Sequence, residues 1–414
     1  MSTSAHMVPR PSSSAPAAVF AGIERGSPAY RRASLALFLA GFATFSLLYC
    51  VQPLLPEFAR DYRISPTASS MALSLTTGAL AVSILVSGAV SQGLPRRGLM
   101  FASMLLAGLC NLLAALAPNW SLLLAARFCE GLVLGGVPAV AMAWLAEEIH
   151  PRDLGKAMGL YVAGTAFGGM MGRVGMGLLV EWESWRLAMA TLGALGLASA
   201  LGFAVLLPPS RRFVAASALG LGHHVRVWSS HLRHRDLPRL FAIGFLLTSV
   251  FVTLFNYAGF RLSAPPFRLG PTAISLIFLS YISGMFASPW AGQLADRFGR
   301  RRPLTGSLAL MVTGSLITLS VSLPVVAIGI LLVTIGFFGA HAVASGWVGR
   351  LAGDAKGHAS SLYLLSYYMG SSFVGSAGGW FWQAHGWAGV VGLTSVLAAL
   401  AVGLALSLGG AARG

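Results

Sequence analysis

The chain has 414 residues, of which 56% are hydrophobic and only 10% are charged. An ordinary soluble domain carries about 25% charged residues, so this composition excludes a water-soluble enzyme and a disordered chain. The formal net charge of +16 comes from basic residues that lie mainly at the ends of apolar runs. That placement is typical of membrane anchoring and not of a nucleic-acid surface.

The first half begins after a polar segment. Residues 1–33 are rich in Ser, Pro and Ala and are predicted to form a disordered, basic tail with no cleavage site after it. Residues 34–207 are predicted to form six membrane-spanning helices, because they contain six apolar runs of sufficient length. These runs lie near 34–55, 68–91, 99–117, 121–146, 157–180 and 187–207.

A linker then interrupts the apolar pattern. Residues 208–238 contain two prolines, several arginines and four histidines, so they cannot cross hydrocarbon. Apolar residues recur in it at helical spacing and predict an interfacial amphipathic helix on anionic lipid. They are Leu221, Val225, Trp228 and Leu232. The histidines lack a zinc-binding spacing, so no metal site is predicted.

Six further apolar runs make up the second half, residues 239–409, and a short tail of residues 410–414 follows. The runs lie near 240–260, 272–292, 303–323, 325–348, 359–381 and 387–407. The chain is therefore predicted to be an all-α integral membrane protein with twelve transmembrane helices.

The two halves repeat each other. The segment LYVAGTAFGG, which begins at Leu160, aligns with LYLLSYYMGS, which begins at Leu362. At nearly the same shift, GAVSQGLPRR from Gly88 aligns with GQLADRFGRR from Gly292. Transporters use internal repeats to build two halves that rock around a site near the bilayer midplane. We therefore predict two pseudo-symmetric six-helix bundles.

The basic residues predict the orientation. If both termini are cytoplasmic, 21 of the 28 basic residues lie in cytoplasmic segments and five lie outside. Positive charge is concentrated in the cytoplasmic loops of membrane proteins. We therefore expect a multi-pass membrane protein with both termini in the cytoplasm.

One loop carries a family resemblance. The segment GQLADRFGRRR resembles the loop signature of the major facilitator superfamily of secondary transporters, and the resemblance covers about residues 34–409. RFCEG on span four and GTAFGGMMGR on span five are weaker matches. Within the superfamily the chain is similar to bacterial efflux permeases of the arabinose-efflux and multidrug-exporter type, on YCVQPLLPEFARDYRIS, GGMMGRV, NYAGFRL and SGWVGRLAG. The resemblance implies the major facilitator fold and the bacterial inner (plasma) membrane.

The chain departs from the family pattern in two places. In the first-half loop, Gln92 and Gly93 stand where Asp and Arg are expected, and Pro95 replaces a glycine. We therefore expect the first-half loop latch to be weakened or absent. Span five also lacks the Gly-Pro pair of drug and proton antiporters.

Glu130 is the one acidic residue well inside a predicted span, and Arg127 lies on the same helical face three residues earlier. A charge at the centre of a membrane helix costs about 2.5–3.5 kcal/mol, and such groups usually mark ion or proton pathways. We predict a coupled pair in which protonation of Glu130 frees Arg127. The resemblance associates the span-four arginine with coupling. The alternative is a pair that only neutralises its own charges.

Two further titratable or charged residues lie within spans. His341, in the middle of span ten, is predicted to carry a proton, because histidine changes its charge near neutral pH. Its structural alternative is a neutral histidine that bonds to a hydroxyl group. Arg173 lies among the glycines of span five, where it could bind an anionic substrate or serve as a structural arginine that reaches water.

Aromatic and polar residues of spans one, seven, ten and eleven predict the substrate cavity. Such side chains are the usual lining for an organic ligand, although each also suits helix packing or an interfacial aromatic belt. With Arg173, the candidates for substrate binding are Tyr49, Gln52, Asn256, Tyr257, Trp347 and Tyr367.

The second-half loop is predicted to act as a conformational latch. Its residues are Gly292, Asp296, Arg297, Gly299, Arg300 and Arg301. Asp296 can pair with a neighbouring helix end while the arginines hold phosphates or carboxylates, which would stabilise one of two access states. A purely topological role accounts for the arginines but not for Asp296.

Taken together, these features predict a secondary active transporter that works by alternating access and exports a small organic or amphiphilic compound in exchange for protons. Its partners would be the solute, protons and anionic lipids, with no cofactor, metal or nucleic acid, and we expect a monomer. One alternative is an importer of a metabolite or an organic anion. A remote alternative is a membrane-embedded enzyme or receptor, but the sequence has no HExxH, nucleophile elbow or paired intramembrane acids, so no enzyme is predicted.

Overall fold

The computed structural model of the protein describes residues 22–90, 94–213 and 220–409. Helices make up nearly all of this part of the chain. The first half contains α1 (Pro28–Tyr49), η1 (Gln52–Leu54), α2 (Leu55–Asp61), α3 (Pro66–Val90), α4 (Arg96–Leu116), α5 (Trp120–Leu134), α6 (Gly136–Glu148), α7 (Leu154–Trp182) and α8 (Trp185–Leu206). The linker contains α9 (Leu221–Leu232). The second half contains α10 (Leu237–Ser263), α11 (Pro271–Ser275), η2 (Leu276–Ser280), α12 (Tyr281–Phe298), α13 (Arg301–Ile317), α14 (Leu323–Leu351), η3 (Gly353–Ala355) and α15 (Lys356–Ser407).

The helices confirm the twelve predicted spans. Within the described residues, nine helical segments are long and apolar enough to cross a membrane. One of them, α15, has 52 residues and contains two spans, because Gly386 breaks the helix with a φ of 58° and a ψ of −143°. Glycine adopts this backbone conformation without steric cost. The helices α7 and α13 occupy the two remaining predicted positions.

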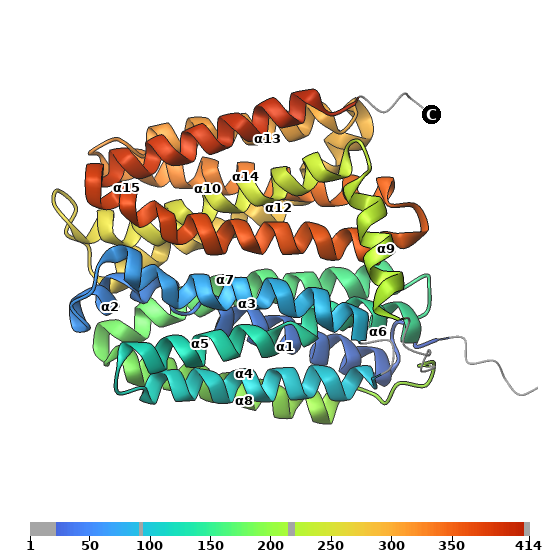
Figure 1. Cartoon of the computed structure of the whole chain (residues 1–414). Coiled ribbons are helices and arrows are strands. Elements are labelled where there is room, and N and C mark those ends of the chain that lie inside the picture. Colours follow the sequence, from blue (N-terminus) through green and yellow to red (C-terminus); the bar gives the residue numbers. More distant parts are fainter. Residues whose placement is uncertain (1–21, 91–93, 214–219, 410–414) are drawn as a thin grey trace, which may run out of the picture.

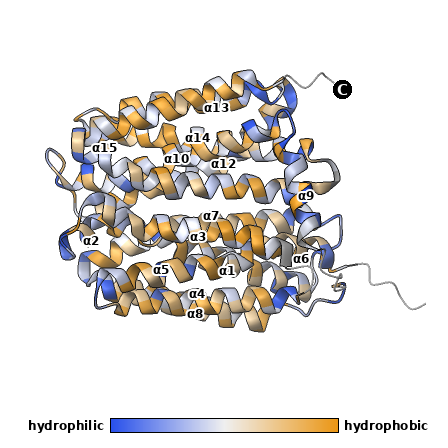
Figure 2. Ribbon diagram, viewed as in Figure 1, coloured by the Kyte–Doolittle hydropathy of each residue, from blue (hydrophilic) through white to orange (hydrophobic). Residues whose placement is uncertain are grey.

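The spans form two bundles that lie side by side, α1–α8 in one and α10–α15 in the other (Figure 1). The linker helix α9 runs across one end of both bundles, which we call the linker end; the other is the opposite end. Apolar residues cover the sides of the bundles along their length (Figure 2). A continuous exposed apolar surface of this kind is suited to lipid.

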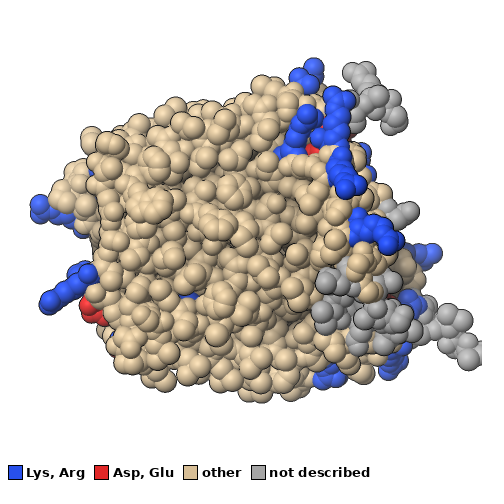
Figure 3. Space-filling model, in the orientation of Figure 1, with Lys and Arg blue, Asp and Glu red and all other residues tan. Residues whose placement is uncertain are grey.

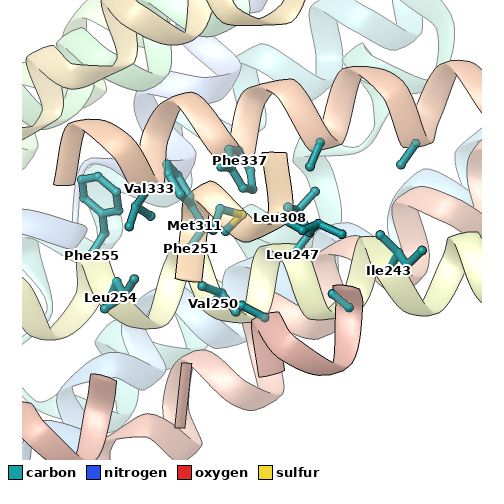
Figure 4. Packing of buried hydrophobic residues seen from close by; sticks show 14 of the residues in the cluster. Ile243, Leu247, Val250, Phe251, Leu254, Phe255, Leu308, Met311, Val333 and Phe337 are labelled. Atoms are coloured by element: carbon teal, nitrogen blue, oxygen red, sulfur yellow. The ribbon is translucent and has the colours of Figure 1, made fainter. Parts of the chain in front are cut away.

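The core of the second bundle is built around α10, which packs against α14 and α15, and α13 packs against the same two helices. The side chains of α10 interdigitate with those of α13 and α14, as Figure 4 shows. The rings of Phe251 and Phe337 stack in parallel with their centroids 3.8 Å apart. This packing places one face of α10 and α14 in the core and leaves another face toward the first bundle.

The first helix begins earlier than predicted. We expected disorder through residue 33, but α1 begins at Pro28, with Ser27 accepting a hydrogen bond from the Tyr30 backbone N–H as its N-cap. Ile23 pairs with the segment after α6, donating to the Glu148 carbonyl at 2.8 Å. The predicted boundary was therefore wrong, because a cap and a backbone pairing order residues whose composition is typical of a tail.

The linker helix packs on the protein with one face and leaves two of its predicted apolar residues exposed. His224 and His231 are buried and Trp228 packs against the second bundle, whereas Val225 and Leu232 are exposed. His224 Nδ1 lies 2.9 Å from His358 Nε2 at the start of α15. The helix is therefore attached to the protein by its aromatic and histidine side chains, and the predicted contact with anionic lipid stays a prediction.

Candidate functional site

A cavity of about 650 Å³ lies between the two bundles, with walls from α1, α7, α10, α12, α14 and α15. Its lining begins near the middle of the molecule at Tyr49 and Arg173. From there it continues along α7 to Met158 and along α12 to Pro289, which are closer to the linker end. The cavity therefore extends from the centre toward the linker end.

Arg173 lies at the deep end of this cavity and is buried. Its Nε donates to Gln52 Oε1 at 2.6 Å and its Nη1 donates to the Gly169 carbonyl at 2.5 Å. The guanidinium carbon lies 3.9 Å from the ring centroid of Tyr49 and 4.9 Å from that of Tyr281. Aromatic faces attract a cation at such distances. These contacts hold the guanidinium at the deep end of the cavity.

Polar contacts between the bundles lie on the far side of Arg173. Gln52 Nε2 donates to Asn256 Oδ1 at 2.7 Å and thereby joins η1 to α10. The hydroxyl of Tyr257 lies 3.3 Å from Ser70 Oγ on α3. We call these four residues, Gln52, Asn256, Tyr257 and Ser70, the polar seal.

Further contacts join the bundles on the linker side of the polar seal as well as nearer the opposite end. On the linker side, Ser372 Oγ on α15 donates to the Ser74 carbonyl on α3 at 2.7 Å. The backbone N–H of Thr272 donates to the Glu181 carboxylate at 3.0 Å, which joins α11 to α7. A cavity lined toward the linker end and closed by these contacts is the arrangement expected for a transporter in one of its two access states.

The predicted substrate residues fall into three groups. Tyr49, Arg173 and Tyr367 line the cavity. Gln52, Asn256 and Tyr257 lie in the polar seal and not in the cavity wall. Trp347 lies 3% exposed in the hydrophobic core of the second bundle, so its predicted place in the cavity lining was wrong.

His341 lines the cavity from α14. Its Nδ1 lies 3.0 Å from the Tyr363 hydroxyl, which is the contact expected for the structural alternative. Its ring is also nearly parallel to that of Phe337, with centroids 6.2 Å apart. The side chain is thus fixed by its neighbours and still faces the cavity.

Arg127 and Glu130 lie inside the first bundle, away from the cavity lining. The two side chains are fully buried, and Arg127 Nη1 lies 2.6 Å from Glu130 Oε2. Arg127 also donates to backbone carbonyls, at 3.1 Å to Leu47, 2.8 Å to Leu48 and 3.2 Å to Ala72. Leu47 and Leu48 belong to the last turn of α1, whose carbonyls have no partner within the helix. Arg127 therefore caps α1 as well as pairing with Glu130, and Glu130 Oε1 has no hydrogen-bond partner among the residues that the structure describes.

In the second-half loop, Asp296 Oδ1 lies 3.5 Å from Arg350 Nη2 at the end of α14, and both side chains are exposed. Exposed pairs contribute about 0–1 kcal/mol. Gly299 ends α12 with a φ of 80°, a conformation that favours glycine. Burial lowers the pKa of the Arg300 guanidinium from its ordinary value, the charge of Arg350 lowers it further, and Asp296 opposes both. The predicted helix-end contact of Asp296 is present, and its role as a latch stays a prediction.

The other latch residues take simpler positions. Arg297 lies in the last turn of α12 and Arg301 is the first residue of α13, and both are exposed. A Cβ at Gly292 would meet no atom within 4 Å, so packing does not require glycine there.

The first-half loop shows a different ion pair. Gln92 and Gly93 lie outside the described residues, and Pro95 directly precedes α4. The Arg96 guanidinium binds the Glu147 carboxylate at the end of α6 through Nε at 2.9 Å and Nη2 at 2.6 Å. A bidentate, partly buried pair is stronger than an exposed one. The first half therefore joins its helix ends with its own ion pair, which the loop comparison did not predict.

Sequence reasoning also missed several aromatic residues of the cavity: Phe251, Tyr281, Phe337, Phe338 and Tyr368. The run of two phenylalanines before His341 was an available signal. Apolar residues occupy all faces of these spans, so periodicity alone does not distinguish a cavity face from a core face. Within the described residues, no group of three His, Cys, Asp or Glu side chains is placed to hold a metal ion.

Two helical bundles around a central cavity define the class of the protein, a multi-pass membrane transporter. The family follows from sequence. Residues 37–268 and 246–410 match the Major Facilitator Superfamily, and the chain belongs to it.

Similar proteins agree with this membership. The MFS-type transporter YybF of Bacillus subtilis (strain 168) is 45% identical over 382 residues, covering 92% of this chain and 94% of its own. The inner membrane transport protein YnfM of Escherichia coli (strain K12) is 44% identical over 380 residues, covering 92% and 91%. A bacterial homologue of the human lysosomal transporter Spinster, solved in an inward-facing and unoccupied conformation, superposes with a TM-score of 0.76 at 14% identity, covering 92% and 97%. This likeness confirms the fold.

Proposed function

We propose that this protein exports a small organic or amphiphilic compound in exchange for protons by alternating access. The observation that carries the proposal is the aromatic cavity, which extends toward the linker end and is closed toward the opposite end by the polar seal. A largely apolar cavity with a few polar groups suits an organic solute.

The charge distribution supports a cytoplasmic linker end. Lys and Arg side chains gather at that end on the face shown in Figure 3, and few lie at the opposite end. By the positive-inside rule, the cavity in this structure then faces the cytoplasm. Solute would bind from the cytoplasm, and rearrangement of the two bundles would break the seal and open the cavity to the outside.

The hydrogen bonds between the two bundles are suited to such a movement. The hydrogen bonds of the polar seal join the bundles through neutral side chains, at 2.7 Å for Gln52 and Asn256 and 3.3 Å for Tyr257 and Ser70. A neutral hydrogen bond contributes about 0.5–1.5 kcal/mol net. The hydrogen bonds of the polar seal therefore stabilise this state by an amount of free energy that the binding of a solute can offset.

Glu130 is the proton carrier in this proposal. When Glu130 is protonated, Arg127 keeps its three carbonyl acceptors, and the negative end of the α1 helix dipole stabilises its charge. The arginine is therefore not freed, as the sequence suggested, but it remains satisfied. One proton moving across 100 mV supplies about 2.3 kcal/mol, enough to accumulate a solute roughly 50-fold. His341 is the second candidate, because it faces the cavity.

Inverted membrane vesicles test the export of aromatic compounds. The vesicle lumen is acidified, and accumulation is measured for three naphthalenes that carry a sulfonate, a sulfonamide or an ammonium group. We expect at least one to accumulate above vesicles without the protein, because an antiporter exchanges lumenal protons for external solute. Accumulation only in right-side-out vesicles would indicate import, and no pH-driven movement of any compound would contradict the proposal.

Two variants separate the proton carriers in the same vesicles. Glu130→Gln keeps a polar partner for Arg127 but cannot titrate, so we expect solute exchange without pH-driven accumulation. His341→Gln is the matched control at the cavity. If Glu130→Gln accumulates solute as the wild type does and His341→Gln does not, then His341 is the carrier.

A further inference from the structure

The cavity has an unbalanced charge. Among the described residues that line it, Arg173 is the one Lys, Arg, Asp or Glu. The remaining walls are aromatic, aliphatic or neutral polar, apart from His341. A solute that enters this cavity therefore meets a positive charge at the deep end and no negative charge.

The guanidinium of Arg173 forms no ion pair within the described chain. Its hydrogen bonds go to a side-chain amide and a backbone carbonyl, Gln52 Oε1 and the Gly169 oxygen. The other arginine buried within a span, Arg127, is paired with Glu130 at 2.6 Å. An unpaired charge in a membrane protein is costly and usually marks a functional site.

A purely structural role does not require this charge. Holding Gln52 needs one hydrogen-bond donor, which a neutral side chain also supplies. The guanidinium instead lies beside three rings, with its carbon 3.9 Å from the Tyr49 centroid, 4.9 Å from that of Tyr281 and 5.1 Å from that of Phe278. Such rings fix its orientation while leaving the positive charge uncancelled.

The walls next to Arg173 are suited to a flat apolar body. Phe337 and Phe338 lie on α14 and Tyr367 lies on α15, all in the cavity lining. Aromatic walls of this kind stack on planar rings. A volume of about 650 Å³ accommodates a molecule of two or three fused rings.

We infer that the cavity binds an amphiphilic organic anion, with its carboxylate or sulfonate on Arg173 and its apolar body against Phe337, Phe338 and Tyr367. This inference rests on the proposed function and names its substrate class. Export of such a solute is also favoured by the membrane potential, because a negative interior drives an anion outward by about 2.3 kcal/mol per 100 mV.

Binding without transport tests the inference. The purified full chain in nanodiscs of neutral lipid is titrated calorimetrically with 2-naphthalenesulfonate and with 2-naphthalenesulfonamide, which share a shape and differ in charge at pH 7. Empty nanodiscs supply the background. We expect the sulfonate to bind about tenfold or more tightly, as one charge-assisted contact predicts. Equal affinities, or no saturable sulfonate binding, would overturn the inference.

Variants then locate the contact. Arg173→Gln should reduce the sulfonate preference about tenfold or more. Because Arg173 also supports Gln52, a second pair leaves it in place: Tyr281→Glu puts a carboxylate beside the guanidinium, and Tyr281→Gln is its neutral control. Both variants lose the Tyr281 ring, so the assignment predicts that the sulfonate preference is about tenfold or more lower in Tyr281→Glu than in Tyr281→Gln. An undiminished preference in Tyr281→Glu would contradict the assignment.

The two proposals fail separately. Selective sulfonate binding to a protein that accumulates no solute in inverted vesicles would contradict export and leave the substrate class standing. Proton-driven accumulation of the sulfonamide with no preference for the sulfonate would contradict the substrate class and leave export standing.

Discussion

Arg127 shows how one buried side chain has two structural tasks. It neutralises Glu130 and satisfies the last carbonyls of α1, Leu47 and Leu48. In hydrocarbon no water can replace these partners. The arginine is therefore required for the helix end whether or not Glu130 is charged.

Removal of Arg127 is expected to destabilise the protein more than removal of the Glu130 charge. Arg127→Met leaves a buried carboxylate without its ionic partner and removes three hydrogen bonds to backbone carbonyls, and we expect it to lower the free energy of unfolding by about 3–5 kcal/mol. Glu130→Gln keeps a polar partner and should change it by about 1 kcal/mol. Chemical unfolding of the two variants in the same detergent measures both. Equal stabilities would contradict the capping role.

At the scale of helices, the contact between α1 and α7 depends on small residues. Gly164 and Gly172 of α7 are buried against α1. A Cβ built on Gly164 would lie 2.6 Å from the Phe38 carbonyl oxygen, and one on Gly172 would lie 2.6 Å from the Ser46 Cα. Small residues let membrane helices approach closely. This approach places Arg173 of α7 beside Tyr49 of α1.

A glycine substitution tests this contact. We expect Gly164→Ala to lower the free energy of unfolding by about 1–3 kcal/mol, because the added carbon meets the backbone of α1. The matched control is Gly175→Ala on the same helix, where a Cβ meets no atom within 4 Å. Alanine favours helix there, so the control should be neutral or slightly stabilising. Thermal unfolding of both variants in detergent decides, and a stable Gly164→Ala protein would contradict the packing argument.

At the scale of the molecule, the pseudo-symmetric halves differ in their loops. The second half places Asp296 3.5 Å from Arg350 in an exposed pair, whereas the first half binds Glu147 to Arg96 at 2.6 Å in a partly buried pair. The sequence motif therefore does not indicate which half has the stronger helix-end contact.

The orientation of the whole molecule can be tested by cysteine labelling. In a background with Cys50, Cys110 and Cys129 replaced by Ser, we expect Arg268→Cys to react with an impermeant maleimide in intact spheroplasts. Asp296→Cys should react only after permeabilisation, because the positive-inside rule places the linker end in the cytoplasm. Both parent side chains are exposed. Reaction of Asp296→Cys from outside would reverse the orientation and the direction of the proposed export.

The fold class, the twelve spans and the family were all predictable from the amino-acid sequence. A segment that crosses hydrocarbon must form its backbone hydrogen bonds within its own helix and must be apolar over most of its length. Such long apolar runs can be read directly from the sequence. Gly386, which separates the last two spans, lies between the predicted runs 359–381 and 387–407.

The grouping of the polar residues was not predictable and depends on how the helices pack. Tyr49 and Arg173 line the cavity, Asn256 and Tyr257 seal it, and Trp347 lies in the core, although all were predicted from the same kind of pattern. Spans that are apolar on every face carry no periodic signal for rotation about the helix axis. That rotation is set by contacts between helices distant in sequence, and it decides which side chain faces the solute.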